Sequence, residues 1–207
     1  MDEIDRVRRG YEELGADYAA RTSDEARELA ILSDFLDSLE APTRLLDAGC
    51  GQGKPVLGRV TEEATAVGLD VSHEQLEVAA ETVPPARLVH GEMTRLPFQD
   101  DTFDAVTAYN SIIHVPLADH QTVLDEFARV LRTGGRVLLS EASDEFERVN
   151  PNWLDSGITM TWHMAGAEAT REQLQAAGFH ITDEWEPPAT TASDGPQPPF
   201  FAARLDT

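Results

Sequence analysis

The stretch that decides the fold is Leu45–Pro55, which reads LLDAGCGQGKP. A short apolar run ends in an aspartate, and three glycines at alternating positions follow it. Glycine lets the backbone come close to a ligand and adopt φ angles that are closed to other residues. The stretch therefore predicts a buried strand that turns through a ligand-binding loop into a helix beginning near Pro55.

Short apolar strands alternate with helices on either side of this loop. We expect strands at 44–48, 64–70, 87–90, 103–109 and 136–140, and helices near 73–81 and 119–131. The pair Gly134-Gly135 is expected to break the second of these helices. Strands that alternate with helices indicate parallel strands buried on both faces. The sequence predicts an α/β doubly wound sheet.

The C-terminal part departs from this alternation. A helix at 168–177 is expected to stop at Gly178 and to lead into an apolar run at 179–182. The loop before 200–204 is too short and too rich in proline for the helical crossover that parallel strands need, so the last two strands are expected to be antiparallel. Residues 143–167 are expected to form an irregular insertion over the sheet.

The N-terminal part reads as two amphipathic helices, at 4–20 and 24–39, with a capping signal for the second at Ser23-Asp24. A chain of 207 residues can bury one core, and we expect 1–207 to form a single domain.

The sequence contains no run of about twenty apolar residues, so it predicts no membrane-spanning helix. The acidic N-terminus lacks the order of a signal peptide, and a lone Cys50 provides no disulfide framework. These features favour the cytoplasm, and no ligand-spaced cluster predicts a metal site.

Charge is the outlying feature of the composition. Asp and Glu number 38 against 16 Lys and Arg, for a formal net charge of −22, and Lys54 is the only lysine. Such a chain repels nucleic-acid phosphates and anionic membrane surfaces, so neither is expected as a partner. Acidic excess with almost no lysine resembles the proteins of salt-loving microbes. Self-repulsion of this size predicts that the fold loses stability in low salt.

Three classes of ligand are bound by a glycine turn of this kind. A phosphate-binding P-loop needs a glycine at Ala48 and a hydroxyl at Pro55, so it fails twice. A dinucleotide turn needs its third glycine one position later than Gly53, although Asp70 ends the next strand at about the right distance. A nucleotide-cofactor oxidoreductase therefore stays open as an alternative.

The third class fits best, because five segments in order resemble the motifs of class I S-adenosylmethionine (SAM)-dependent methyltransferases of the small-molecule branch. The segments are 45–55, 68–72, 91–98 with 103–106, 131–138 and 177–179. The resemblance covers nearly the whole chain. It implies a Rossmann-like class I methyltransferase sheet, mostly parallel with an antiparallel final strand.

The resemblance also implies a cofactor site around the first two motifs. Gly49 and Gly51 would lie against the methionine and ribose parts of SAM, and Asp47 would orient its amino group. Asp70 would bind the two ribose hydroxyls, and Val71 belongs to the same motif. From the residues alone, Asp47 could instead be a capping residue at the strand end, although the functional role is favoured. Asp70 could be a helix N-cap, although Ser72 is the better cap candidate.

Further cofactor contacts follow from the later motifs and from the N-terminus. Glu92 stands where the family commonly has an aspartate that accepts from the adenine amino group, and Met93 would lie on the ring unless it only fills the core. Tyr109 would border the methionine group. Tyr11 and Tyr18 resemble a lid within residues 1–40 that closes over SAM, or they pack that helix onto the sheet.

Two further groups of residues are candidates for binding and activating the methyl acceptor. His114 follows the fourth strand and is the candidate general base, if the acceptor must lose a proton. Trp153, Trp162 and His163 lie in the insertion and would wall an acceptor pocket, or the tryptophans simply cover the sheet edge. The sequence thus predicts methyl transfer from SAM to a small molecule. A SAM-binding protein without catalysis is a further alternative, and S-adenosylhomocysteine is the expected product of the reaction.

Overall fold

The computed structural model describes residues 3–19, 26–188 and 197–206, with side chains described for all of these except 16–19. The α-helices are α1 Glu3–Ala19, α2 Ala26–Asp37, α3 Val56–Val60, α4 His73–Thr82, α5 His120–Val130 and α6 Gly166–Ala176. The 3₁₀ turns are η1 Met93–Arg95, η2 Ile112–His114 and η3 Leu117–Asp119. The strands are β1 Arg44–Ala48, β2 Thr65–Asp70, β3 Arg87–His90, β4 Phe103–Ala108, β5 Leu131–Ser140, β6 Phe146–Trp153, β7 Ile158–Met164, β8 Phe179–Trp185 and β9 Phe200–Leu205.

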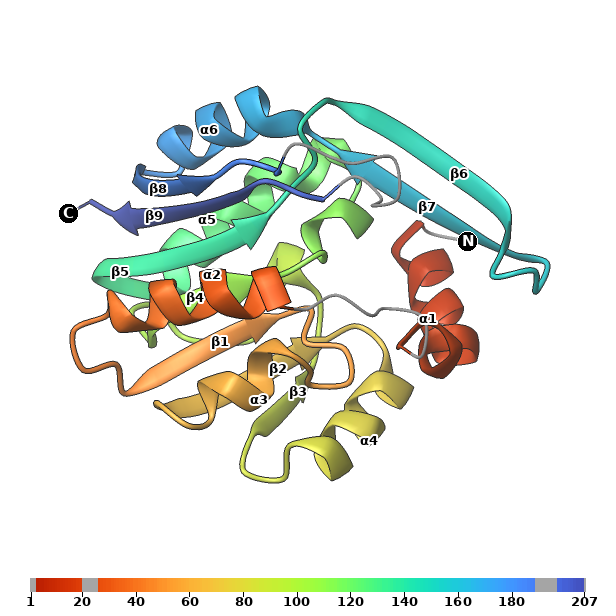
Figure 1. Ribbon diagram of the computed structural model, residues 1–207, viewed down its shortest axis with the longest axis horizontal. Coiled ribbons are helices and arrows are strands. Elements are labelled where there is room, and N and C mark those ends of the chain that lie inside the picture. Colours follow the sequence, from red (N-terminus) through yellow and green to blue (C-terminus); the bar gives the residue numbers. More distant parts are fainter. Residues whose placement is uncertain (1–2, 20–25, 189–196, 207) are drawn as a thin grey trace.

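Seven strands form one sheet in the order β3-β2-β1-β4-β5-β9-β8 (Figure 1). The first five are parallel, and β9 pairs antiparallel with both β5 and β8. The predicted mostly parallel sheet with an antiparallel end is therefore confirmed. The chain runs outward from β1 to β3 on one side and from β4 to β5 on the other. A ligand crevice is expected where the order reverses, at the carboxyl ends of β1 and β4.

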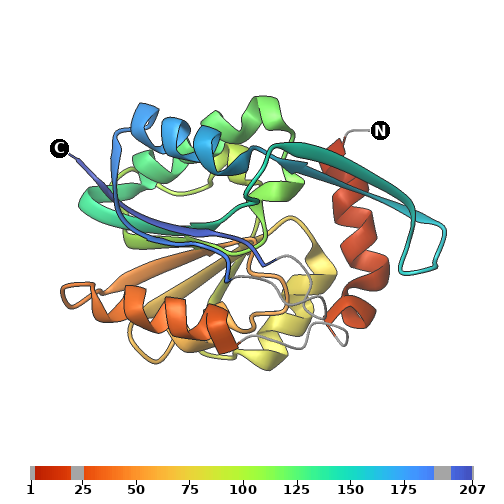
Figure 2. The ribbon, with the colours of Figure 1, turned by 45° about the horizontal axis from the view of Figure 1, so that its top comes forward.

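Helices cover both faces of the sheet because its central strands are apolar on both sides. β4 is buried at every position, and β1 at all but its first residue. One core packs side chains of α2, α3 and α4 against the sheet, and the other packs α5 and α6 against the opposite face (Figure 2). The buried face of α2 is Ile31, Leu32, Phe35 and Leu36. α2 is thus part of the core beneath the sheet.

The sequence predicted most of these elements to within a few residues. It also predicted that glycines end two of the helices, and only one of these two predictions is correct. Gly178 follows α6 with φ +89°, which confirms it as the residue that ends this helix. The helix before β5 ends at Val130, ahead of Gly134-Gly135, so the prediction that this pair breaks the helix is wrong. The pair lies inside β5, beside a register irregularity against β4. The capping signal at Ser23-Asp24 lies outside the described residues.

The insertion at 143–167 is a β-hairpin, so its predicted irregularity is wrong. β6 and β7 pair antiparallel from Phe146↔Met164 to Trp153↔Ile158, with a register shift after Asn150. β6 is exposed at most positions and contains Pro151, so its sequence lacks the alternation that identifies a strand. Both views show the hairpin projecting beyond the sheet and lying along α1 (Figures 1 and 2).

The helix α1 and the hairpin lie at the carboxyl ends of the parallel strands (Figure 1). α1 contacts β7 on one side and α4 on the other. Its Val7 is buried in a small separate core with Trp153 and Met160 of the hairpin. These contacts fix α1 across the end of the sheet. In the described part of the chain, no helix combines the length and apolar character needed to cross a membrane.

Candidate functional site

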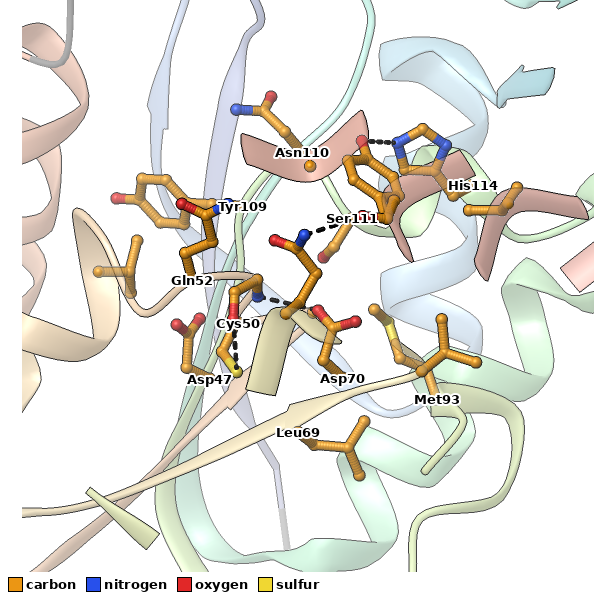
Figure 3. Close-up of a pocket in the computed structure, with 18 of the residues that line it drawn as sticks. Asp47, Cys50, Gln52, Leu69, Asp70, Met93, Tyr109, Asn110, Ser111 and His114 are labelled. Carbon is orange, nitrogen blue, oxygen red and sulfur yellow. Dashed lines mark hydrogen bonds between the residues drawn. The ribbon is translucent and has the colours of Figure 1, made fainter. Parts of the chain in front are cut away.

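A cavity of about 510 Å³ opens at the carboxyl ends of β1, β2 and β4. Its floor comes from the loop after β1 and from the ends of β2 and β4, and α1 covers it. The loop after β3 closes one side with Glu92 and Met93, and η2 closes another with His114. This is the place where an open parallel sheet binds ligands. Figure 3 shows the labelled side chains that surround the cavity.

The glycine loop forms the floor because its backbone is held in conformations that favour glycine. Gly49, Gly51 and Gly53 have φ of +78°, +50° and +85°. A Cβ on Gly49 would lie 2.3 Å from Cβ of Ser111, so the loop passes close beneath the segment after β4. At Gly51 the nearest atom to such a Cβ is Oε1 of Gln75 at 3.8 Å, so this glycine borders open space. The loop therefore exposes backbone to the cavity at Gly51.

Asp70, at the end of β2, points its carboxylate into the cavity from the far side of this loop (Figure 3). Its Oδ2 accepts a hydrogen bond from the backbone N–H of Gly51 at 2.8 Å, and its Oδ1 accepts one from Ser72 N–H at 2.9 Å. Burial raises the pKa of Asp70 even though these hydrogen bonds oppose the shift. The Oγ of Ser72 caps α4 by accepting from Gln75 N–H at 3.3 Å, so the cap belongs to Ser72. Each Asp70 oxygen keeps acceptor capacity toward the cavity.

Asp47, at the end of β1, is a second carboxylate on the cavity wall. It is 3% exposed and accepts a hydrogen bond from the hydroxyl of Thr107 at 2.9 Å. Burial raises the pKa of Asp47 to about 7, and the charge of nearby Asp70 adds to the rise. A buried carboxylate with a single neutral partner is costly when ionised. A cationic group bound in the cavity would offset that cost.

Helix α2 and the residues directly after β4 complete the wall beside Asp47. The hydroxyl of Tyr109 donates to the backbone carbonyl of Glu28 at 3.3 Å, and Asn110 Nδ2 lies 3.4 Å from Oε1 of Glu28. Burial, with the charges of Glu28 and Asp47, raises the pKa of Tyr109, which stays a neutral phenol. Sequence reasoning missed Glu28 because it lies on α2, outside every motif. Only its position in space connects it to the site.

The opposite end of the cavity is bounded by the residues after β2 and β3. Val71, Glu92 and Met93 all line it, and Glu92 is exposed at the rim. The Cε of Met93 lies 2.8 Å from where a Cβ of Gly49 would stand, and the side chain also packs against the main core. Met93 therefore both lines the cavity and contributes to packing.

Cys50 lies in the glycine loop on the cavity wall. Burial raises the pKa of Cys50 well above its ordinary value, so its thiol stays protonated.

His114 joins three segments that are far apart in the sequence. Its Nε2 lies 2.8 Å from the hydroxyl of Tyr11 on α1, and its Nδ1 lies 3.3 Å from the carbonyl oxygen of Thr161 on β7. A carbonyl only accepts, so Nδ1 carries the hydrogen and Tyr11 donates to Nε2. Burial, with a smaller contribution from nearby His163, lowers the pKa of His114 to about 4, so the ring is neutral at pH 7. A dashed line at the His114 ring in Figure 3 marks the hydrogen bond with the Tyr11 hydroxyl.

A glutamine of α4 holds the covering helix in place. Gln75 Nε2 donates to the backbone carbonyl of Tyr11 at 3.0 Å, although that carbonyl lies within a helix. A Cβ on Gly15 would lie 1.7 Å from Gln75 Nε2, so only a glycine leaves room for this contact. Both Gln75 and Gly15 line the cavity. Sequence reasoning missed Gln75, which is buried on a helix and carries no motif signal.

The predicted acceptor residues lie behind the cavity wall and are not among the residues that line it. Trp153 is buried and its ring centroid is 5.3 Å from that of Tyr11, while the ring of Trp162 is 6.2 Å from that of His114. His163 Nε2 pairs with Glu3 of α1 at 3.0 Å, and its Nδ1 with Glu147 of β6 at 3.2 Å.

Their positions show what these side chains do in the fold. Trp153 and Trp162 support Tyr11 and His114 from behind, and His163 joins α1 to the hairpin. The side chain of Tyr18 lies outside the described residues. All the other predicted cofactor-binding residues line the cavity. They are Tyr11, Asp47, Gly49, Gly51, Asp70, Val71, Glu92, Met93 and Tyr109.

Fold and cavity together define the class I SAM-dependent methyltransferase architecture. A solved structure of a SAM-dependent methyltransferase from Methanosarcina mazei superposes with a TM-score of 0.73 at 17% identity, over 84% of this chain and 97% of that one. A likeness at this level of identity concerns the fold alone. It agrees with the strand order and with the antiparallel end.

The central segment of the sequence is similar to known methyltransferases. Residues 46–139 match the model described as a methyltransferase domain. Methyltransferase GfsG of Streptomyces halstedii is 41% identical over 111 residues, which is 50% of this chain and 39% of that protein. A demethylmenaquinone methyltransferase of Shouchella clausii is 38% identical over 113 residues, or 51% of this chain and 47% of that protein. The chain thus matches less than half the length of these curated relatives.

Proposed function

We propose that this protein transfers a methyl group from SAM to a small organic acceptor. The observation that carries the proposal is the pairing of a glycine floor with two carboxylates, Asp47 and Asp70, at one end of a cavity of about 510 Å³. The residues fit the ligand, because the amino group and sulfonium of SAM are cationic and its ribose offers two hydroxyl donors. Asp47 would bind the amino group, and Asp70 would bind the ribose hydroxyls.

The charge of the cavity favours SAM over a dinucleotide. Asp47, Asp70, Glu28 and Glu92 line it, and Lys54 is the only lysine or arginine among the described lining residues. A dinucleotide carries a pyrophosphate with two negative charges, which these carboxylates would repel. α3 does not provide the helix N-terminus that binds phosphate in dinucleotide folds, since it has five residues and begins after Pro55, which has no N–H.

A small acceptor is favoured by what covers the cavity and by the charge of the chain. α1 lies across the opening of the cavity, and the net charge of −22 opposes nucleic acid. One relative is named as a demethylmenaquinone methyltransferase. Within this proposal α1 is the lid of the site, the hairpin at 143–167 supports it, and His114 is the group that receives a proton from the acceptor.

The test is direct binding and turnover in high salt. Calorimetry should detect binding of SAM and S-adenosylhomocysteine and no binding of NAD, and radiolabelled SAM should methylate a component of a metabolite extract. NAD binding in place of SAM would support the oxidoreductase alternative. SAM binding with no labelled product from any extract would support a SAM-binding protein without catalysis.

A further inference from the structure

We infer that Tyr11 is a catalytic residue that takes the proton from a phenolic or enolic hydroxyl of the acceptor and passes its own proton to His114. The inference rests on the proposed methyl transfer and goes beyond it by assigning the group that contacts the acceptor and the chemical class of that acceptor. It starts from the hydrogen bonds of the residue that the sequence singled out as a base.

The nitrogen of His114 that could act as a base is covered by Tyr11. Its Nδ1–H is fixed by the carbonyl of Thr161 at 3.3 Å, and its Nε2 accepts from the Tyr11 hydroxyl at 2.8 Å. An acceptor molecule in the cavity therefore meets the phenolic oxygen of Tyr11 before it meets the imidazole. Because a hydroxyl can accept while it donates, Tyr11 can pass a proton along this line.

The position of the pair is held from several sides. The ring of Tyr11 packs edge-on against Trp153 with centroids 5.3 Å apart, and its backbone carbonyl is bound by Gln75 at 3.0 Å. His114 follows β4 on the rigid end of the sheet and is backed by Trp162. Such support fixes the hydroxyl and the imidazole in one geometry, which proton transfer requires.

The surroundings of the pair indicate an acceptor that has no charged group apart from its reacting oxygen. The described cavity residues contributed by α1 and by the segment after β4 are uncharged, namely Ile4, Val7, Tyr11, Gly15, Asn110, Ser111, His114 and Val115. The cavity's carboxylates lie instead on the glycine loop side, on α2 and after β3. An ammonium or carboxylate on the acceptor would meet no opposite charge on the α1 side, where an apolar or aromatic molecule with one hydroxyl fits.

The weakness of the base selects the kind of hydroxyl. Burial lowers the pKa of His114 to about 4, so its imidazole takes up a proton only as the acceptor oxygen bonds to the methyl carbon and its O–H becomes more acidic. An aliphatic alcohol holds its proton far more tightly than a phenol, whose pKa is about 10. Phenols and enols are therefore the hydroxyls that this pair can deprotonate during methyl transfer.

The step balances in atoms and electrons. The acceptor O–H gives its proton to Oη of Tyr11, and the former proton of Tyr11 goes to Nε2 of His114. The acceptor oxygen forms a bond to the methyl carbon, and the sulfur keeps the electron pair of the carbon–sulfur bond that breaks. Tyr11 ends neutral, His114 ends protonated with its Nδ1–H still bound to Thr161, and the proton leaves to water when α1 moves away.

The test uses the full chain, the variant Tyr11→Phe and matched probe acceptors. Phenol, 4-nitrophenol, benzyl alcohol and benzylamine are offered with saturating SAM at about pH 8, where 4-nitrophenol is already ionised and phenol is not. We expect methylation of the two phenols only. Tyr11→Phe should lower kcat roughly 10²-fold for phenol and far less for 4-nitrophenol, which needs no base, and should change the Kd of SAM by less than about twofold.

A second readout needs no turnover. Nitrogen NMR of the protein without SAM should show His114 as the neutral Nδ1–H form, with an Nε2 signal that shifts in Tyr11→Phe as its hydrogen bond is lost. His73→Gln is the control, because His73 is exposed on α4 outside the site and this change should alter neither readout.

Each contrary outcome has one meaning. Equal losses for the two phenols in Tyr11→Phe would reduce Tyr11 to a structural residue. Transfer to benzylamine or benzyl alcohol in preference to phenol, or no transfer to either phenol while SAM binds, would overturn the acceptor class. An Nε2 signal unchanged by Tyr11→Phe would also contradict the inference. Absence of SAM binding would instead refute the proposed function beneath it.

Discussion

At the scale of single residues, the two carboxylates of the site, Asp70 and Asp47, differ in their hydrogen-bond partners and in their burial. Asp70 is held by the N–H groups of Gly51 and Ser72, so its orientation is fixed before any ligand arrives. Asp47 is buried and accepts a hydrogen bond from the hydroxyl of Thr107, and the pKa of its carboxyl is raised to about 7. Asp70 is thus suited to accept from neutral hydroxyls, and Asp47 to pair with a cation.

This difference predicts that SAM affinity depends on pH through Asp47. The raised pKa means that the fraction of ionised Asp47 grows as the pH rises toward about 7 and is nearly complete above it. If the ionised carboxylate binds the SAM amino group, the Kd should fall up to about tenfold per unit between pH 5.5 and 7 and then level off. Calorimetry over this range measures it.

Asp47→Asn is the matched variant for this prediction. It should bind SAM more weakly at pH 7, with the pH dependence largely gone, because its side chain does not ionise. A wild-type Kd that stays flat across the range, or a slope that survives in Asp47→Asn, would show that another group is responsible. Asp70 is the natural candidate, since it lines the cavity and burial also raises the pKa of its carboxyl.

Residue by residue, the sequence identified the part of the site that lies on motifs. Asp47 and Asp70 lie at the ends of strands and Gly49 follows one directly, so their place at the sheet edge can be predicted from the order of elements. Glu28 and Gln75 lie on helices whose cavity-facing positions depend on how the helices pack. Nothing local distinguishes these two residues from other polar helix positions.

At the scale of elements, α1 and the hairpin β6–β7 form one supporting unit over the cavity. α1 is joined to the hairpin through His163 with Glu3, and to α4 through Gln75. Neither connection could be predicted, because each joins segments more than sixty residues apart. β6 was missed for a local reason, since it is solvent-exposed and contains Pro151, and an exposed edge strand need not alternate.

The contact between α1 and α4 predicts that Gly15 controls how long the cofactor stays bound. In Gly15→Ala the new methyl group would occupy the place of Gln75 Nε2 and break its hydrogen bond to the Tyr11 carbonyl. The loss of one such bond is worth about 1 kcal/mol, so SAM should dissociate about fivefold faster. Stopped-flow displacement of bound SAM gives this rate.

A double-mutant cycle separates this mechanism from a general loss of stability. On a Gln75→Ala background the alanine at position 15 meets no amide, so Gly15→Ala should add little to the dissociation rate. Additive effects of the two changes would mean that Gly15 does not act through Gln75.

At the scale of the whole molecule, the strongly negative net charge and the order of the strands have separate causes. The formal net charge of −22 does not disturb the order of strands, which follows from apolar runs and glycine turns that any α/β sheet of this kind requires. Arginines pair with acidic side chains on the surface, as in Arg171 with Glu184 at 2.8 Å, but acidic residues outnumber basic ones by 38 to 16. Repulsion among the acidic side chains is therefore expected to exceed the attraction of their ion pairs with arginine.

This excess predicts that the protein is stabilised by salt. The screening length falls from about 30 Å at 0.01 M to about 3 Å at 1 M, so molar KCl removes most of the repulsion between surface carboxylates. The melting temperature should rise clearly from millimolar to molar KCl. A melting temperature that is unchanged, or higher at low salt, would show that ion pairs outweigh repulsion and would remove the resemblance to halophilic proteins.

The central claim is that Asp70 and the glycine loop hold the ribose of SAM, and calorimetry of SAM binding to Asp70→Ala in high salt tests it most directly. Because the variant loses the acceptor of two hydroxyl hydrogen bonds, we expect its Kd to rise at least about tenfold, with the melting temperature of the unliganded protein little lowered. A variant that binds SAM as tightly as the wild-type protein would contradict the account.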